Sequence, residues 1–179
     1  MVSTTIVLLL LCANVGKALA SCNLGKTTCV TEDLLHMIMR NGPTLKDDLK
    51  RRPTFFASLK TLQTLYNIKD IVKFDDAKIN IGGGYDSTTG IFTAPRNGIY
   101  IFFCAIMANG GGNVQFQLNK NDQLYTGGYA AKSDYGAQTV NSLVELRIGD
   151  KVYIKHRTGT SQTVYGNHFS TFSGYLLSE

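Results

Sequence analysis

Two segments that we expect to be surface loops, residues 125–138 and residues 156–168, concentrate the side chains that could recognise a ligand. Tyrosine rings stack on the faces of sugars, arginine pairs with carboxylates, and asparagine and glutamine read hydroxyl groups. An acidic glycan such as a sialic acid would suit this combination, and the alternative is an ordinary polar surface. The candidate ligand-binding residues are Tyr129, Lys132, Asp134, Tyr135, Arg157, Gln162, Tyr165 and Asn167.

Motifs for catalysis and metal binding are missing from the sequence. The three histidines, at positions 36, 156 and 168, have no glutamate or second histidine at the spacing of a helical zinc site. No Gly-x-Ser-x-Gly or Cys-x-x-Cys motif occurs, so acyl transfer and dithiol chemistry have no support. The tripeptide Gly25-Lys26-Thr27 imitates the end of a phosphate-binding loop, but position 20 is alanine where that motif needs glycine. The sequence therefore gives no support for these kinds of chemistry, and we expect no cofactor.

The first 20 residues have the features of a secretory signal peptide. An apolar run covers residues 6–15, interrupted only by Asn14, and the small residues of Ala18-Leu19-Ala20 suit cleavage after position 20. The run is shorter than the roughly 20 apolar residues that a membrane-spanning helix needs. We therefore expect a secreted, extracellular protein without membrane insertion, and the alternative is an uncleaved anchor.

The charge balance does not indicate a nucleic-acid partner. The chain carries 18 lysine and arginine residues against 13 acidic residues, a net charge of +5. Cleavage after position 20 removes Lys17 and no acid, which leaves 17 basic against 13 acidic residues, or +4. A charge of this size supports solubility and a weak attraction to anionic surfaces.

Three cysteines remain after the signal peptide. Cys104 lies in an apolar run, where we expect a buried free thiol, whereas Cys22 and Cys29 lie in a polar tail exposed to an oxidising compartment. A Cys22–Cys29 disulfide can form within one chain, and the same cysteines can instead link neighbouring chains into higher oligomers. Both alternatives fit the sequence equally well.

Residues 21–52 differ in composition from the rest and form an N-terminal extension. Thr31 can cap a short helix over residues 31–40, and Gly42-Pro43 would end it. The apolar residues of this stretch span too few heptads for a coiled coil, so a loosely ordered stalk is the alternative to a helix. No Gly-X-Y repeat occurs, so the extension has no collagen segment.

A β pattern begins at residue 54. Short runs rich in β-branched and aromatic residues alternate with turn sequences, which indicates an all-β sandwich. The turn sequences are Gly82-Gly83-Gly84, Asn97-Gly98, Asn109-Gly110-Gly111-Gly112 and Gly149-Asp150.

The run at residues 99–107 predicts a strand that is apolar on both faces. Side chains of a strand alternate between its faces. One face would carry Tyr100, Phe102, Cys104 and Ile106, and the other would carry Ile99, Ile101, Phe103, Ala105 and Met107. Only one face of a sheet meets the core of a two-sheet sandwich, so the second face needs a cover. A partner subunit is one such cover, and the chain's own termini or loops are the alternative.

The spacing of aromatic anchors in this part of the chain resembles the signature of the C1q globular head. The anchors are Phe74, Asn80, Tyr85, Phe92 and the run Gly98-Ile99-Tyr100-Ile101-Phe102-Phe103-Cys104, with Cys104 where the family usually has an aromatic residue. The resemblance covers residues 53–179. It implies a ten-stranded jelly roll of the C1q and tumour-necrosis-factor-like type, which forms homotrimers and binds ligands outside cells without catalysing reactions.

Some members of that family bind calcium near the trimer axis through paired acids. In the equivalent stretch, residues 127–142, this chain offers only Asp134, whereas calcium takes six or more oxygen ligands. We therefore expect no metal site, and the alternative is three Asp134 side chains that meet on the axis.

The resemblance and the candidate side chains together predict a secreted homotrimer for innate-immune pattern recognition. Its ligands would be microbial or anionic glycans, which three equal sites would bind with avidity. The alternative is an extracellular signalling ligand of the cerebellin or tumour-necrosis-factor-like type that binds a cell-surface receptor. A structural protein of the extracellular matrix is the third hypothesis.

Overall fold

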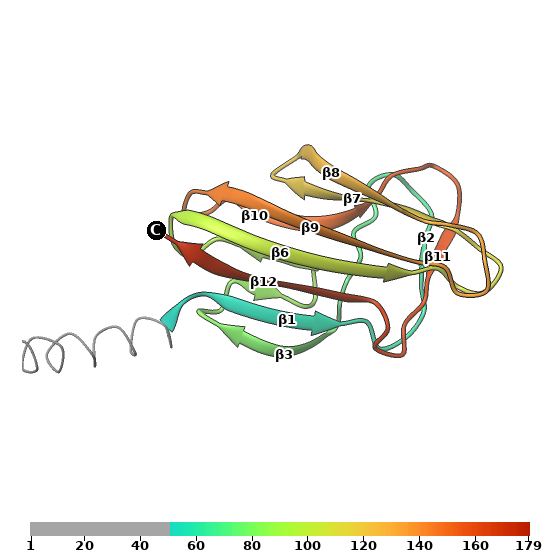
Figure 1. Ribbon diagram of the computed structural model, residues 1–179, viewed down its shortest axis with the longest axis horizontal. Helices are drawn as coiled ribbons and strands as arrows, with labels where there is room; N and C mark the ends of the chain where they lie inside the picture. The colour runs from blue at the N-terminus through green and yellow to red at the C-terminus, as the bar shows by residue number, and fades with distance from the viewer. Residues whose placement is uncertain (1–50) are drawn as a thin grey trace, which may run out of the picture. The chain divides into compact units, whose positions relative to one another are not determined.

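The computed structural model describes residues 51–179, and Figure 1 shows that they form a sandwich of β-strands. The predicted signal peptide at residues 1–20 lies outside the described residues. The same is true of the predicted helix at 31–40 and of the Cys22–Cys29 disulfide. The start of β1 and the end of β12 lie at one end of the sandwich, because Thr54 pairs with Tyr175.

The first large sheet has the strand order β3-β1-β12-β6-β9, with antiparallel neighbours. Strands from distant parts of the sequence are therefore neighbours, which is typical of a jelly roll. The strands are β1 (Thr54–Ser58), β3 (Asp76–Ile81), β6 (Gly98–Met107), β9 (Ala137–Leu146) and β12 (Thr171–Ser178).

The second large sheet has the order β4-β5-β10-β7-β8. Its strands are β4 (Tyr85–Asp86), β5 (Ile91–Thr93), β7 (Val114–Lys120), β8 (Gln123–Ala130) and β10 (Lys151–His156). These two five-stranded sheets confirm the predicted ten-stranded sandwich. A small additional sheet pairs β2 (Gln63–Leu65) with β11 (Gln162–Val164), and the sequence reasoning did not foresee it.

The aromatic anchors of the sequence form the centre of the core between the two sheets. The ring of Phe55 stacks on that of Tyr85, with centroids 4.7 Å apart, and lies 5.1 Å from Phe92. The anchor Asn80 has a different task, because its amide accepts from the Tyr85 N–H at 3.1 Å and donates to the Tyr85 carbonyl at 2.8 Å. The spacing of the anchors thus reflects core packing and one clamped turn.

Strand β6 has the predicted two-faced character. Tyr100, Phe102, Cys104 and Ile106 are fully buried in the core, whereas the intervening side chains point outward. Of these, Ile99 is 42% exposed and Phe103 is 37% exposed. Cys104 is a buried free cysteine, as predicted, and burial raises the pKa of its thiol above the usual value. An apolar outer face therefore remains open on this sheet.

Candidate functional site

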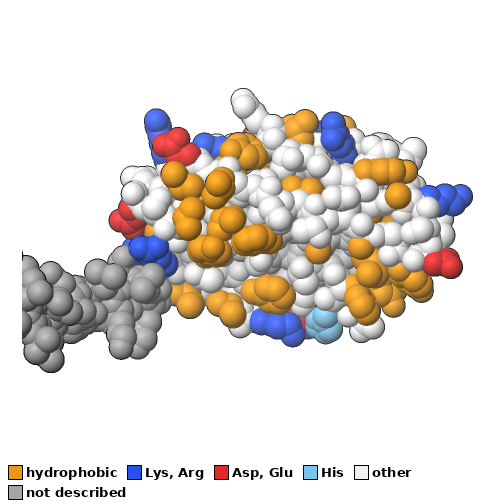
Figure 2. Space-filling view, in the orientation of Figure 1, with side chains coloured by type: hydrophobic (Ala, Val, Ile, Leu, Met, Phe, Trp, Pro, Cys, Tyr) orange, Lys and Arg blue, Asp and Glu red, His pale blue; other side chains and the backbone are white. Residues whose placement is uncertain are grey.

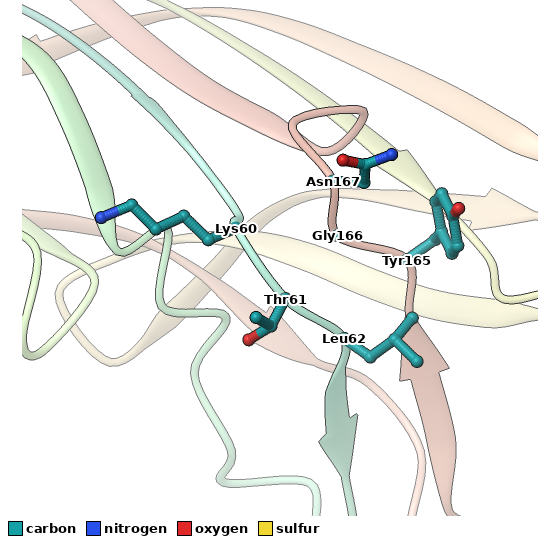
Figure 3. A pocket seen from close by; sticks show the side chains of 6 residues that line it. All are labelled: Lys60, Thr61, Leu62, Tyr165, Gly166 and Asn167. Carbon is teal, nitrogen blue, oxygen red and sulfur yellow. The ribbon is translucent and has the colours of Figure 1, made fainter.

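A surface groove with a volume of about 490 Å³ lies at the end of the sandwich opposite to the start of β1 and the end of β12. One side is residues 60–62, which connect β1 to β2, and the other is residues 165–167, which follow β11. Figure 3 shows the six residues that line it, Lys60, Thr61, Leu62, Tyr165, Gly166 and Asn167. Two predicted ligand-binding residues, Tyr165 and Asn167, are therefore part of this groove.

Backbone contacts hold the two sides of the groove together. The Asn167 N–H donates to the Lys60 carbonyl at 2.8 Å, and the His168 N–H donates to the Leu59 carbonyl at 2.9 Å. Gly166 packs so closely on the Thr61 backbone that a Cβ atom there would collide with it. Asn167 and His168 have φ values of 50° and 65°, a left-handed conformation that turns the chain sharply toward β12.

An aromatic cluster borders the groove. The ring of Tyr165 meets Tyr135 edge to face, with centroids 4.8 Å apart, and lies 5.7 Å from the ring of Phe169. Tyr135 and Tyr165 belong to the two different segments that the sequence reasoning selected, and the structure brings them together. Phe169, which is 54% exposed, was missed because nothing in its local sequence separates an exposed phenylalanine from a buried one.

Charged residues extend from the Lys60 side of the groove. The Asp76 carboxylate forms an ion pair with the Lys78 ammonium group at 3.1 Å. The Lys60 ammonium group and the His168 Nδ1 atom lie 3.8 Å and 3.4 Å from the same carboxylate. The hydrogen bond from Lys78, followed by the charges of Lys60 and His168, lowers the pKa of Asp76. The side of the groove beside β3 is therefore polar, and its two lysines are paired with the Asp76 carboxylate.

Ser58, His168 and Asp76 lie together, but their geometry does not suit nucleophilic catalysis. A catalytic histidine contacts the nucleophile with one ring nitrogen and the acid with the other. Here the same atom, His168 Nδ1, lies 2.9 Å from the Ser58 hydroxyl and 3.4 Å from the Asp76 carboxylate. Ser58 is 1% exposed, so its hydroxyl is also inaccessible to a substrate. The three side chains form a structural hydrogen-bond group.

A second pair of predicted residues, Tyr129 and Arg157, lies on the outer face of the second large sheet, on either side of Gln115. Tyr129 pairs with Gln115 across β8 and β7, and the Arg157 N–H donates to the Gln115 carbonyl at 3.0 Å. The Arg157 guanidinium lies over Gly127, where a Cβ atom would collide with it. Tyr129 was placed in a loop from 125 to 138, and this was wrong because strand β8 continues to Ala130.

The other predicted residues do not join these sites. The segment 156–168 is not a continuous loop, because Gln162 begins β11 and is only 7% exposed. Its Oε1 accepts from the Gln115 N–H at 2.7 Å and faces the buried His156 Nε2 at 3.1 Å, so Gln162 has a structural position. Lys132 and Asp134 are exposed in residues 131–136 and do not line the groove.

Within residues 51–179, no three histidine, cysteine, aspartate or glutamate side chains come together as metal ligands. A threefold site made by Asp134 would require three chains, so a single chain does not test it. In the same part of the chain, no helix is long and apolar enough to cross a membrane.

Comparisons with known proteins agree with this architecture. A family model described as the C1q domain matches residues 54–177. The globular domain of zebrafish complement 1qA is similar in structure, with a TM-score of 0.57 and 22% identity over 71% of this chain and 98% of that one. Murine APRIL, at TM-score 0.55 and 11% identity, covers 70% of this chain and 99% of its own.

Eiger TNF from S. frugiperda has a TM-score of 0.53 and 11% identity, and the match covers 72% of this chain and 94% of that one. At these identities the structural likeness establishes a shared fold.

Proposed function

Because the chain belongs to the C1q domain family, we propose that it acts as a secreted, trimeric ligand-binding protein that recognises microbial or anionic glycan surfaces. The observation that carries this proposal is the open apolar face of the sheet β3-β1-β12-β6-β9. Its exposed large side chains are Ile79, Ile81, Ile99, Phe103, Leu143, Tyr175 and Leu177.

The apolar face is continuous across several strands. Tyr175 of β12 pairs with Ile101 of β6, and the rings of Phe103 and Tyr175 stack with centroids 6.5 Å apart. In Figure 2 hydrophobic side chains gather where Figure 1 draws β6, β9 and β12. Burial of four or five such side chains contributes roughly 6–15 kcal/mol before the entropy of association is subtracted. That amount can hold an obligate oligomer together.

Strand β8, which lies beside β9, offers a second apolar surface that can meet this face. Leu124 and Tyr125 are about half exposed there, and the Tyr125 hydroxyl donates to the Leu143 carbonyl at 2.6 Å. Contact between two different patches is a heterologous interface, which closes into a ring when the rotation between subunits allows it. A threefold ring of this kind supports the proposed homotrimer.

The groove beside Tyr165 supplies the proposed ligand site. It combines an aromatic ring with the Asn167 amide, which suit the face and the hydroxyl groups of a sugar, whereas the Lys60 ammonium group extends away toward Asp76. Each trimer would present three grooves at the end of the sandwich away from its C-terminus. Multivalent binding of this kind converts weak single contacts into avidity for a surface that repeats its ligands.

Sedimentation of the secreted protein tests the assembly. We expect a single species of three chain masses at micromolar concentration, and a folded monomer for Phe103→Asp, because a carboxylate would be buried in the interface. Gln117→Asp, on the outer face of the other sheet, should remain trimeric. A monomeric wild-type protein would refute the trimer.

A glycan and lipopolysaccharide binding screen on the same protein tests the ligand. We expect binding to a subset of microbial or acidic glycans, with loss in Tyr165→Ala. Saturable nanomolar binding to one membrane protein, with no glycan bound, would instead establish a signalling ligand for a cell-surface receptor.

A further inference from the structure

The outer face of strands β10, β7 and β8 carries a set of polar side chains that the groove does not use. Alternation places this set opposite the core, since the intervening residues Phe116, Leu118, Ile154 and His156 are fully or almost fully buried. We call it the basic face, and its residues are Gln115, Gln117, Gly127, Tyr129, Lys155 and Arg157.

The pairing between neighbouring strands aligns these residues in two rows across the sheet. Lys155 pairs with Gln117, which pairs with Gly127, and in the next row Gln115 pairs with Tyr129. Arg157 extends the second row, because its N–H donates to the Gln115 carbonyl at 3.0 Å. Two cations, two amides and an aromatic ring therefore share the outer face of β10, β7 and β8, with Arg157 directly after the end of β10.

The two cations of the basic face have no carboxylate partner among residues 51–179. The ion pairs in this part of the chain involve other cations, such as Lys60, Lys78 and Lys120. The Arg157 guanidinium lies over the strand only because position 127 has no side chain. A cation without an acidic partner is available to bind an external anion.

The amides of the basic face favour a glycan over other anions. The Gln117 amide donates to the Asn119 Oδ1 at 2.7 Å, which orients it and leaves its carbonyl and second N–H available. Nucleic acid is bound mainly by many cations on phosphates, whereas here two glutamines accompany only two cations. A lipid surface needs protruding apolar side chains, and Tyr129 is the only large one in this set.

From this juxtaposition we propose that the basic face binds an acidic polysaccharide, with Arg157 and Lys155 on its carboxylate or sulfate groups. Gln115 and Gln117 contact its hydroxyls, and the Tyr129 ring packs on a sugar. This proposal rests on the proposed function and adds a second site, separate from the groove at Tyr165. Of the two acid-recognising residues, Lys155 thus lies on β10 and Arg157 lies directly after its end.

Binding of the secreted trimer to immobilised polysaccharides tests the basic face. The probes are heparin, which carries sulfate, polygalacturonate, which carries only carboxylate, and dextran, which is neutral. We expect binding to at least one acidic probe that weakens with salt, and tenfold or greater weakening in Arg157→Gln, because charge-assisted hydrogen bonds are lost. Arg147→Gln removes the same charge at the other end of β10 and should bind like the wild type.

Gly127→Ala provides a test at constant net charge. The added methyl group displaces the guanidinium of Arg157, so affinity for the acidic probe should fall several-fold. Gly159→Ala is the matched control, because no atom lies within 4 Å of the added Cβ. The proposal would be overturned if Gly127→Ala kept wild-type affinity and Arg157→Gln and Arg147→Gln lost affinity equally. Binding would then depend on the overall positive charge and not on the position of Arg157.

Two further outcomes separate this proposal from the proposed function. If Tyr165→Ala no longer binds the acidic probes and Arg157→Gln still binds them, acid recognition belongs to the groove. That result would overturn the proposal for the basic face. Binding of neutral microbial glycans with no binding of either acidic probe would do the same and leave the proposed function intact. Only a protein that binds no glycan at all would remove both.

Discussion

The ring of Tyr135 meets the ring of Tyr165 edge to face, with centroids 4.8 Å apart and planes inclined by 68°. Tyr135 precedes β9 and Tyr165 follows β11, so the contact joins two segments that are far apart in the sequence. Tyr135 makes this contact from a left-handed backbone conformation, with φ of 60°. The pair therefore connects residues 131–136 to the border of the groove.

A double-mutant cycle should detect this contact. We expect Tyr135→Ala and Tyr165→Ala to be coupled by about 0.5–1.5 kcal/mol, the usual range for an aromatic pair beyond the area that it buries. Urea unfolding of the two single variants and the double variant, at one protein concentration, measures the coupling. Tyr125→Ala with Tyr165→Ala, whose rings are not in contact, should be additive. Additivity in the Tyr135 cycle would show that the contact is energetically neutral.

Gly166→Ala should open or distort the groove. A Cβ atom at position 166 collides with the Thr61 backbone, which cannot move aside as a flexible side chain could. We expect a loss of about 1–3 kcal/mol in the free energy of unfolding, the usual cost of overpacking. Thermal or urea unfolding measures the loss, and any glycan bound through Tyr165 should bind more weakly. Gly159→Ala should have no measurable effect, and an equally stable Gly166→Ala variant would contradict the close packing.

Cys104 should be inert in the native protein. Its thiol is fully buried, and burial raises its pKa, so almost no reactive thiolate is present at neutral pH. Alkylation with iodoacetamide, followed by peptide mapping, should leave Cys104 unmodified until the protein is unfolded. Labelling of this residue under native conditions would show that the core around β6 opens.

Substitution of Cys104 should also reveal how apolar its surroundings are. Cys104→Ser buries a hydroxyl among apolar side chains, whereas Cys104→Ala leaves only a small void. We expect the serine variant to lose about 1–3 kcal/mol more than the alanine variant if the hydroxyl finds no partner. Urea unfolding of both variants makes the comparison, and equal stability would indicate a polar neighbour for the hydroxyl.

Asp76 should contribute to the stability of the domain in a pH-dependent way. The hydrogen bond from Lys78 and the charges of Lys60 and His168 lower the pKa of Asp76 in the folded state. A carboxylate with a lowered pKa stabilises the fold above its unfolded pKa of about 4, and this contribution is lost as the pH falls through the folded value. Asp76→Asn should therefore lose less stability than the wild type between pH 5 and about pH 2.

Melting temperatures measured across that pH range test the role of Asp76. Asp134→Asn is the control, because Asp134 is an exposed acid of residues 131–136 without an ion pair among the described residues. It should follow the wild-type profile. Parallel profiles for Asp76→Asn and the wild type would show that the ion pairs of Asp76 are neutral for folding.

Much of the fold follows from local features of the sequence. The spacing of anchors such as Phe92 and Phe102 reports core-facing positions, and period-two alternation separates the two faces of β6 before any contact is known. The small sheet of β2 and β11 was not predictable in this way. Each of its strands has only three residues, which is too short for alternation to show.

The sequence by itself determined the sandwich, its aromatic core and the open apolar face, because alternation and residue size are properties of a single strand. Only the tertiary structure decided which polar residues meet. It buried Gln162, brought Tyr135 to Tyr165, and placed Arg157 over Gly127. These outcomes depend on the register between strands that are distant in the chain, and a one-residue shift in register would send every side chain of a strand to the opposite face.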